Sequence, residues 1–340
     1  MTVRLKKLHD QVMVITGASS GIGLATARMA ARQGAKVVLA CRNQQALDEI
    51  VDSIRAEGGD ALAVQADVGV AADHDSILGA ATEKYGLVDT WVNNAGVSIF
   101  GRLEDVPVED QRKLFDTNYW GVVYGSITAV AHLKKHGGAL INIGSEVSDR
   151  AVPLQGAYSA SKHAVKGYTD ALRMELEAEG APVSVTLIKP ASVATGYARH
   201  ARNYMDVEPS LPPPIYAADT VARAILYAAQ HPRRDIYVGS ASKVMSSMGW
   251  RMPGVADQLA GWLIRKQRSE TAAADRADAL YEAGAPVQDD TARDGAHAPR
   301  VRRHSMYTQL STSGRGLVWA GAAALICGTV LTAARGRRWH

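Results

Sequence analysis

Short runs rich in β-branched residues alternate with longer Ala-rich stretches along the first 240 residues, and this alternation is the strongest constraint on the fold. We predict strands at 12–16, 36–40, 61–65, 90–94, 139–144, 183–188 and 235–239. Helical periodicity marks stretches between them, among them 21–33, 43–57, 108–135 and 157–179. This order is typical of a parallel sheet covered by helices on both faces. The sequence therefore predicts an α/β fold built on a doubly wound sheet of about seven strands.

A glycine-rich turn, TGASSGIG, directly follows the first predicted strand and opens a helix. Gly17, Gly21 and Gly23 allow a tight turn and a close approach of the backbone to a pyrophosphate, which the free N–H groups of the helix can bind. The spacing G-x-x-x-G-x-G differs from the usual dinucleotide fingerprint, and such a turn can also be purely structural. Its place between strand and helix favours a dinucleotide site in a Rossmann-like fold.

The end of the second predicted strand indicates which dinucleotide is bound. A site that prefers NAD usually has an acidic residue there, which binds the ribose 2′-hydroxyl. This chain has Cys41 followed by Arg42. A guanidinium without that carboxylate suits a 2′-phosphate, so we expect NADP(H) to be favoured over NAD(H). The alternative is that Arg42 faces solvent on an ordinary loop.

The stretch YSASK places Tyr158 and Lys162 four residues apart, so on a helix they share one face. A nearby ammonium favours the phenolate and lowers the pKa of a tyrosine, which can then exchange a proton with a carbonyl or an alcohol. Ser145 follows the predicted strand 139–144, at the sheet edge where such folds bind ligands. Its hydroxyl can donate a hydrogen bond to a substrate oxygen. Taken alone, the pair could equally be a surface Tyr and Lys on an amphipathic helix.

Over roughly residues 8–240 the chain resembles the short-chain dehydrogenase/reductase family. The motifs that carry the resemblance are TGASSGIG, NNAG at 93–96, N-x-x-G from Asn118 to Gly121, Ser145 and YSASK. The resemblance implies that Tyr158 is the general acid/base and that Lys162 lowers its pKa while holding the nicotinamide ribose. It implies that Ser145 polarises the substrate oxygen and that Asn118 holds a water of the proton relay. In the family, hydride passes directly between the nicotinamide and the substrate carbon.

The resemblance also assigns contacts with the cofactor. Asp67 and Val68 are expected beside the adenine, and Asn94, Ala95 and Gly96 beside the adenosine ribose, where they also brace the sheet. The full set of expected cofactor-binding residues is Gly17, Ser19, Ser20, Gly21, Ile22, Gly23, Arg42, Asp67, Val68, Asn94, Ala95, Gly96, Tyr158, Lys162, Pro190, Val193 and Thr195. We expect no metal site.

One position departs from the family's pattern. After the sixth predicted strand the family commonly has Pro-Gly followed by Val and Thr, and here the stretch reads KPASVATG. Pro190, Val193 and Thr195 match, but Ala191 replaces the glycine. Alanine fits only where the backbone avoids a strongly positive φ. We expect Thr195 to contact the nicotinamide carboxamide or a phosphate.

The segment after this motif is expected to cover the substrate. Tyr197, Tyr204 and Tyr216 could line a pocket for a ring or an alkyl chain, or they could be surface residues packed against a proline-stiffened loop. No charged cluster marks a carboxylate or phosphate clamp. The sequence therefore predicts the class of reaction without naming the substrate.

The last hundred residues extend beyond the predicted catalytic domain, 1–240. Residues 241–283 are expected to form a helical appendage, in which PGVADQLAGWLIRKQR is an amphipathic helix that either lies on a lipid surface or packs over the active-site mouth. We interpret 284–315 as a flexible polar linker. Residues 316–334 carry no charge over 19 positions and are predicted to span a membrane as a helix, the alternative being a soluble or interface-packing helix.

Charge and cysteine content restrict the partners. The formal net charge of +4 comes from the last hundred residues, which favours a membrane surface over nucleic acid, and we expect no nucleic-acid partner. Two distant cysteines and the lack of a secretory signal favour a cytoplasmic catalytic domain that is membrane-associated through its C-terminus. By resemblance, the long helices at 108–135 and 157–179 would pair in a homodimer or homotetramer.

These observations predict an NADP(H)-dependent oxidoreductase acting on CH–OH groups. It would interconvert an alcohol and a carbonyl by hydride transfer, with Tyr158 as general acid/base and a small lipophilic substrate favoured by the membrane location. The alternative is a non-catalytic protein that senses NADP(H) or scaffolds partners at a membrane. The set of Asn118, Ser145, Tyr158 and Lys162 argues against that alternative, because a binding protein needs no proton relay.

Overall fold

A seven-stranded parallel sheet forms the centre of the protein, as the alternating pattern predicts. The structure is a computed structural model that describes residues 3–284 and 301–312. The strands are β1 (Val12–Thr16), β2 (Lys36–Cys41), β3 (Asp60–Gln65), β4 (Thr90–Asn93), β6 (Gly138–Ile143), β7 (Val183–Pro190) and β12 (Asp235–Val238). Their order is β12-β7-β6-β4-β1-β2-β3. The order reverses between β1 and β4, so the carboxyl ends of these two strands bound the crevice where doubly wound folds bind ligands.

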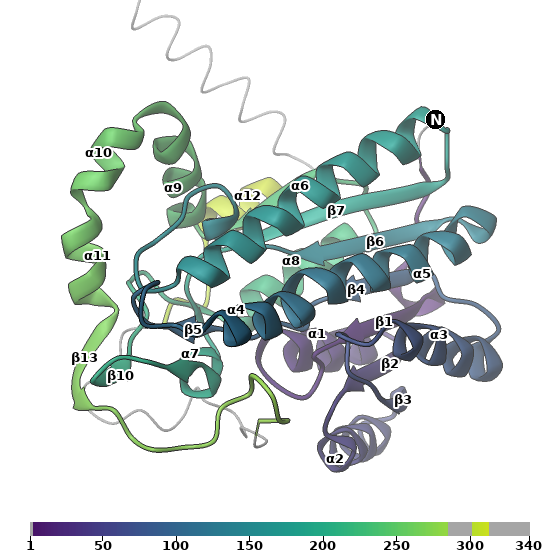
Figure 1. The fold of residues 1–340 in the computed structure, drawn as a ribbon. Helices are drawn as coiled ribbons and strands as arrows, with labels where there is room; N and C mark the ends of the chain where they lie inside the picture. The colour runs from purple at the N-terminus through teal and green to yellow at the C-terminus, as the bar shows by residue number, and fades with distance from the viewer. Residues whose placement is uncertain (1–2, 285–300, 313–340) are drawn as a thin grey trace, which may run out of the picture.

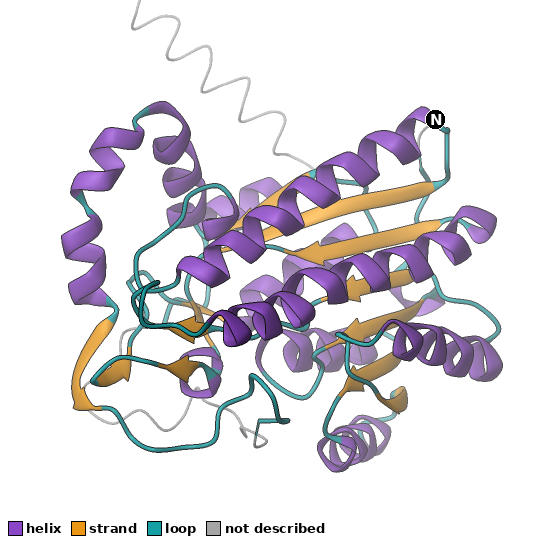
Figure 2. Cartoon of the chain, in the orientation of Figure 1, coloured by secondary structure: helices purple, strands orange, loops and turns teal. Residues whose placement is uncertain are grey.

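Helices cover both faces of the sheet (Figures 1 and 2). The long helices of the fold are α1 (Gly21–Arg32), α2 (Gln44–Ala56), α3 (Ala71–Tyr85), α5 (Gly121–His136), α6 (Gly156–Ala178) and α8 (Ala218–Ala228). Side chains alternate along β1, so that Met13 and Ile15 pack with α1, α2 and α8 while Val12 and Val14 pack with α3, α5 and α6. Burial on both faces explains why the strands are apolar runs without polar alternation.

The predicted helix 108–135 is not continuous. It is divided into α4 (Val108–Phe115), a π-helical turn (Asp116–Trp120) and α5. Asn118 lies in the π turn and is fully buried, with both ends of its amide bonded outside the helix. Sequence periodicity does not register one extra residue in a turn, because the apolar pattern resumes on the next turn.

The residues after β12 form an arm beyond the carboxyl ends of the strands (Figure 1). The arm consists of α9 (Ser240–Arg251), α10 (Pro253–Gln258), α11 (Ala260–Lys266) and β13 (Arg268–Ala272), and β13 pairs with β10 (Val207–Pro209). The amphipathic helix predicted from residue 253 is therefore two short helices, interrupted at Leu259. Of the two predicted placements, the structure has the arm over the mouth of a cavity, which Leu259, Trp262 and Leu263 help to line.

Part of the predicted linker is ordered against the body. Arg302 forms a parallel bridge with Tyr216, and α12 (Met306–Thr312) follows. Thr308 is buried and accepts a hydrogen bond from the N–H of Gly239 at 3.0 Å. These few contacts with distant residues decide the structure of a segment whose own sequence lacks periodicity. Residues 301–312 are thus not a flexible linker.

The predicted membrane span at 316–334 lies outside the described residues. Within the described ranges, none of the helices is both long enough and apolar enough to cross a membrane.

Candidate active site

A cavity of about 1070 Å³ lies at the carboxyl edge of the sheet. Its walls come from the turn after β1, the ends of β2, β4 and β6, the start of α6, the loop after β7 and the C-terminal arm. The predicted site residues all line it except Gly23 and Asn118. Motifs spread over almost 180 residues of sequence are thus assembled around one space.

The glycine-rich turn has the backbone that glycine alone accepts. Gly17 and Gly21 have positive φ values of 63° and 52°. A Cβ on Gly17 would lie 2.7 Å from the Cα of Ala95, and one on Gly23 would lie 2.2 Å from the carbonyl oxygen of Gly17. The turn is therefore packed tightly beneath the N-terminus of α1, whose first N–H groups border the cavity. This cradle fits the pyrophosphate of a dinucleotide.

Hydrogen bonds join β4 to the glycine-rich turn. Thr16 accepts hydrogen bonds through Oγ1 from the N–H groups of Asn94 and Ala95, at 3.0 and 3.1 Å. The Asn94 side chain donates to the carbonyl oxygen of Thr16 at 2.8 Å. The side-chain amide oxygen of Asn118 and the ammonium of Lys162 both face Gly96, where a Cβ would meet them at 3.4 and 3.7 Å. These bonds fix the two loops that meet at the switch point of the sheet.

Arg42 lies at the far wall of the cavity, after β2. Its guanidinium donates hydrogen bonds to the carbonyl oxygens of Ala279, Tyr281 and Glu282, at 2.6, 3.1 and 2.7 Å. Residues 279–282 belong to the segment that follows the arm (residues 273–284), which we call the strap. Arg42 therefore does not simply face solvent, because it fastens a segment almost 240 residues away in sequence.

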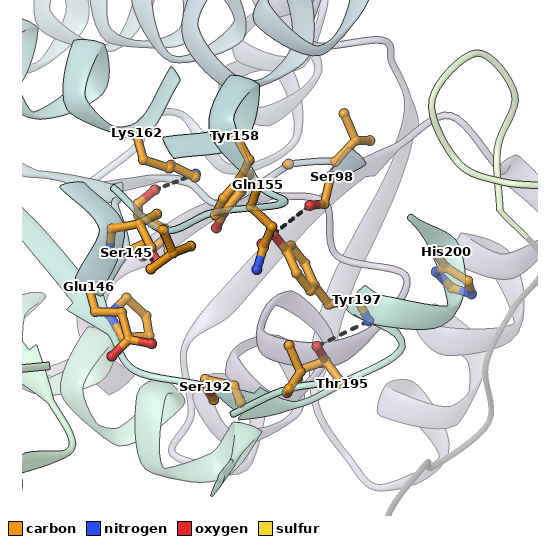
Figure 3. Close-up of a pocket in the computed structure, with 18 of the residues that line it drawn as sticks. Ser98, Ser145, Glu146, Gln155, Tyr158, Lys162, Ser192, Thr195, Tyr197 and His200 are labelled. Atoms are coloured by element: carbon orange, nitrogen blue, oxygen red, sulfur yellow. Dashed lines mark hydrogen bonds between the residues drawn. The ribbon is translucent and has the colours of Figure 1, made fainter. Parts of the chain in front are cut away.

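Ser145 and the pair Tyr158 and Lys162 come together on the opposite side of the cavity (Figure 3). Ser145 ends the loop after β6, and α6 carries the other two on one face. The Lys162 ammonium donates to the carbonyl oxygen of Ile143 at 2.9 Å and lies 5.7 Å from the centre of the Tyr158 ring. Burial lowers the pKa of Lys162 to about 8. A lysine in this setting loses its charge near the upper end of the physiological range.

The pKa of Tyr158 moves opposite to the expected direction. Burial raises it above 10, and hydrogen bonding with Ser145 and Tyr197 opposes that rise without cancelling it. The expectation that Lys162 lowers this pKa is not met here, because the ammonium is directed to the Ile143 carbonyl and burial disfavours the phenolate more strongly.

Asn118 does not reach the cavity with its side chain. Its amide oxygen accepts from the N–H of Val97 at 2.8 Å, and its amide nitrogen donates to the Val97 carbonyl at 2.9 Å and to Ser161 Oγ at 3.1 Å. The side chain therefore holds the loop after β4 against α6. Its role in a water relay stays a prediction.

One of the three tyrosines left open by the sequence lines the cavity. The Tyr197 hydroxyl donates to Gln155 Oε1 at 2.9 Å and bonds the Ser98 hydroxyl at 2.7 Å, and its ring centre lies 5.4 Å from that of Tyr158. Tyr204 and Tyr216 pack elsewhere, Tyr204 by bonding to Asp110 and Tyr216 by full burial. Sequence reasoning could not separate the three, because their positions depend on the path of a loop.

The loop after β7 accommodates its alanine. Ala191 does not have a positive φ; among the described non-glycine residues, Leu154 alone does. The N–H of Ala191 donates to the Val238 carbonyl at 2.9 Å. Thr195 lies against Gly21, where a Cβ would meet its methyl group at 2.9 Å. The replacement of glycine therefore leaves Thr195 beside the pyrophosphate cradle.

Glu146 is a cavity residue that the sequence analysis did not single out. It follows Ser145 directly and borders the same space (Figure 3). Burial raises its pKa to about 7. The only signal in the sequence was an acidic residue next to a predicted catalytic serine.

The fold and the residues at its carboxyl edge define an oxidoreductase of the dinucleotide-binding α/β class. The family model described as short chain dehydrogenase matches residues 11–206, and the chain belongs to this family. "Uncharacterized oxidoreductase YxnA" of Bacillus subtilis (strain 168) is 46% identical over 98% of this chain and 93% of its own length. "11-beta-hydroxysteroid dehydrogenase A" of Sesamum indicum is 30% identical over 78% of this chain and 77% of its own length.

Solved structures show the same fold. A short chain dehydrogenase/reductase from Burkholderia phymatum in complex with NAD has a TM-score of 0.65 and 28% identity, over 81% of this chain and 100% of its own. An alcohol dehydrogenase from the archaeon Thermococcus sibiricus, complexed with 5-hydroxy-NADP, has a TM-score of 0.59 and 27% identity, over 67% of this chain and 95% of its own. Both dinucleotides occur among these neighbours, so the likeness leaves the choice between NADP and NAD open.

Proposed function

We propose that this oxidoreductase interconverts an alcohol and a carbonyl with NADP(H), on a lipophilic substrate. The observation that carries the proposal is the meeting of Ser145, Tyr158 and Lys162 in one cavity with the glycine cradle. The cofactor would be held by the cradle, by the residues after β2, β3 and β4, and by the loop after β7. When bound, it supplies or accepts the hydride.

The side chains of the site would handle the substrate oxygen. In carbonyl reduction, the Tyr158 hydroxyl donates its proton to that oxygen while Ser145 donates a hydrogen bond to it. The raised pKa of Tyr158 keeps the phenol protonated near neutral pH, which suits this acid role. In the reverse direction Tyr158 must first lose its proton, and the phenolate then accepts the proton of the alcohol.

Arg42 supports the preference for NADP(H). The three groups that hold its guanidinium are neutral carbonyls, and within the described ranges no carboxylate forms an ion pair with it. Within the described part of the chain, its Nε–H and one N–H of Nη1 have no acceptor. A 2′-phosphate would supply both the negative charge and the oxygens for these two donors.

The arm supports a lipophilic substrate. Val244, Met245, Met248, Trp262 and Leu263 line the cavity from the side facing the catalytic residues, and methionines adapt to irregular apolar ligands. The sesame relative is named as a dehydrogenase of hydroxysteroids, which are lipophilic. Both observations favour an apolar alcohol or ketone over a sugar or a short acid.

The proposal is tested by turnover of the purified full chain. NADPH and NADH would each be supplied with a matched panel of apolar and polar ketones, and NADP⁺ and NAD⁺ with the corresponding alcohols. We expect faster turnover with NADPH and with the apolar members. Turnover with NADH alone would contradict the assignment of Arg42, and binding of NADPH without turnover on any panel would favour the sensor hypothesis.

We also propose that the chain forms a homodimer or homotetramer through α4, α5 and α6. Trp120, Ile127 and Met174 are exposed by 44%, 59% and 58%, and they belong to this helical face. Light scattering after gel filtration tests this, with Ile127→Glu as the disrupting variant. Exposed apolar side chains of this size are typical of contact surfaces.

Membrane attachment through residues 316–334 remains our proposal from the uncharged sequence of that segment. The test compares membrane fractions of cells that produce the full chain with those of cells producing a chain that ends at residue 312. Equal distribution of the two would contradict the proposal.

A further inference from the structure

Glu146 is held in the wall of the catalytic cavity by a rigid turn. The short helix Glu146–Ser148 begins directly after Ser145, whose hydroxyl accepts from the N–H of Val147 at 3.3 Å. The hydroxyl of Ser148 in turn accepts from the N–H of Ser145 at 3.1 Å. This reciprocal cap fixes the backbone on both sides of Glu146. The backbone that carries Glu146 is therefore as well fixed as that of Ser145.

The carboxyl group has no partner within the described part of the chain. In residues 3–284 and 301–312 it makes no hydrogen bond and no ion pair, whereas the basic groups of this region are bound elsewhere. Arg150 pairs with Asp257. Lys189 donates to Asp149 at 3.1 Å and to the Tyr237 hydroxyl at 2.8 Å.

The remaining cation of the site, Lys162, donates to the Ile143 carbonyl. The walls that the arm places across the cavity are apolar, with Met245, Met248 and Leu263 among them. The Glu146 side chain is only partly buried and borders this cavity, so its carboxyl group is open to a ligand that fills the space. Burial raises its pKa to about 7.

The carboxyl group also lies close to the reaction. Its charge raises the pKa of Tyr158, so the two groups act on each other through the cavity. Glu146 directly follows Ser145, and both residues line the same cavity with Tyr158 (Figure 3). A ligand that fills this space can therefore contact Glu146 as well as Ser145.

We propose that Glu146 is a specificity-determining subsite that accepts a hydrogen bond from a hydroxyl or ammonium group next to the reacting carbon of the substrate. The inference rests on the proposed function and narrows its substrate class. The preferred substrate combines an apolar body, which faces the arm, with a hydrogen-bond donor beside the carbonyl. Hydroxy ketones and amino ketones, with the corresponding diols and amino alcohols, have this form.

The test uses three ketones of equal chain length with the full-length protein and NADPH. One carries no donor, one carries a hydroxyl next to the carbonyl, and one carries an ammonium group there. For the wild type we expect kcat/KM to be at least about tenfold higher with a donor-bearing ketone than with the plain ketone, the difference that one hydrogen bond to a charged group gives.

Two variants separate the two kinds of donor. Glu146→Gln still accepts a hydrogen bond, so it should keep the preference for the hydroxy ketone and lose any preference for the ammonium ketone. Glu146→Leu should lose both preferences while retaining turnover of the plain ketone. Glu104→Gln is the control, because Glu104 also lines the cavity but is paired with Arg102. It should change none of the ratios.

Three results would overturn the subsite. The first is a wild type with no preference among the ketones, and the second is an equal reduction of kcat/KM for all three ketones in Glu146→Leu. The third is weaker NADPH binding, measured by fluorescence, in both variants, which would mean that Glu146 accepts its hydrogen bond from the cofactor and not from the substrate. Thermal unfolding of each variant confirms that it is folded. Failure of the wild type to turn over any ketone would instead overturn the proposed function, and the subsite with it.

Discussion

The charged side chains at the two ends of the cavity differ in how many bonds they make to the protein. At the catalytic end, formed by Ser145, Glu146, Tyr158 and Lys162, the Glu146 carboxyl has no partner in the described part of the chain, and the Lys162 ammonium donates to one carbonyl, that of Ile143. At the Arg42 end, the guanidinium of Arg42 bonds three carbonyls of the strap.

The strap itself is held to the body by further polar contacts. The Tyr281 hydroxyl donates to Asp110 at 2.7 Å, and Arg202 pairs with Asp110 at 2.8 Å and with Asp278 at 3.3 Å. Charges at the Arg42 end thus fasten distant segments together. The charged groups at the catalytic end have pKa values shifted by burial, and such groups are typical of sites that act on a ligand. From this difference we infer that the catalytic end serves the reaction of the substrate and that the Arg42 end holds the strap over the cavity.

The largest test of the comparison is Tyr158→Phe. Removal of the hydroxyl deletes the proposed proton donor without changing the cradle or the strap, so turnover should fall by about 10²–10⁴-fold. NADPH binding, measured by fluorescence, should stay unchanged. Tyr197→Phe is the neighbouring control and should lower turnover far less, because its hydroxyl bonds Ser98 and Gln155. Full activity of Tyr158→Phe would mean that the chemistry lies elsewhere.

Arg42→Ala tests the other end. Loss of the guanidinium should raise KM for NADPH by about ten- to a hundredfold, the range for hydrogen bonds to a charged group. KM for NADH should rise only through loosening of the strap. The additional rise in KM for NADPH therefore measures the proposed contact between Arg42 and the 2′-phosphate. Arg55→Ala is a matched control, because Arg55 also donates to a backbone carbonyl, that of Ala61 at 3.0 Å. Equal increases in KM for NADPH and NADH would mean that Arg42 only holds the strap and does not bind the 2′-phosphate.

Glu146→Gln tests whether the catalytic end is strained, by a readout independent of activity. The pKa of Glu146 is raised from 4.5 to about 7, so the folded state holds more protons than the unfolded state between these values. Its contribution to stability is therefore complete below pH 4.5 and is lost as pH rises through 7.

The Glu146→Gln variant has no ionisable group at this position, so it does not lose stability as pH rises through 7. Its Tm relative to the wild type should rise between pH 5 and pH 8 by roughly 3 °C, which corresponds to about 2 kcal/mol after an allowance for solvent in the cavity. Glu57→Gln, whose carboxylate pairs with Arg32 at 2.9 Å on the surface, should show no such gain. A constant difference in Tm across this pH range would mean that Glu146 has a partner that compensates its charge.

The catalytic end could be predicted from sequence because its geometry is local or fixed by the sheet. Tyr158 and Lys162 are one helical turn apart, and the carboxyl ends of parallel strands always meet at one edge. The seven strands followed from their apolar runs to within two residues at each end, since both faces are buried. The resemblance supplied the order of the motifs but not the direction of the pKa of Tyr158, which depends on burial.

The Arg42 end could not be predicted in the same way. The contact between Arg42 and the strap joins residues almost 240 positions apart through backbone carbonyls, which have no residue type to recognise in a sequence. The same holds for Arg302, whose main chain bonds the loop before α8, and for α12, where Thr308 accepts from the N–H of Gly239. The break of the predicted arm helix at Leu259 is likewise set by how the two halves fit over the cavity.

The smallest expected effect comes from Tyr281→Phe, and it isolates closure from charge. Arg42 is untouched, but the strap loses its bond to Asp110, a buried carboxylate that Arg202 also contacts. Tyr281 is exposed by 48%, so water replaces much of the lost bond. We expect KM to rise about two- to fivefold.

The rise should be the same for NADPH and NADH, because a looser strap uncovers the shared part of the cofactor. Tyr85→Phe is the matched control, since its hydroxyl donates to Asp60 at the same 2.7 Å on a helix that does not line the cavity. It should leave both KM values unchanged. A rise confined to NADPH would show that the strap acts through the orientation of Arg42, and the Arg42 end would then serve recognition as well as closure.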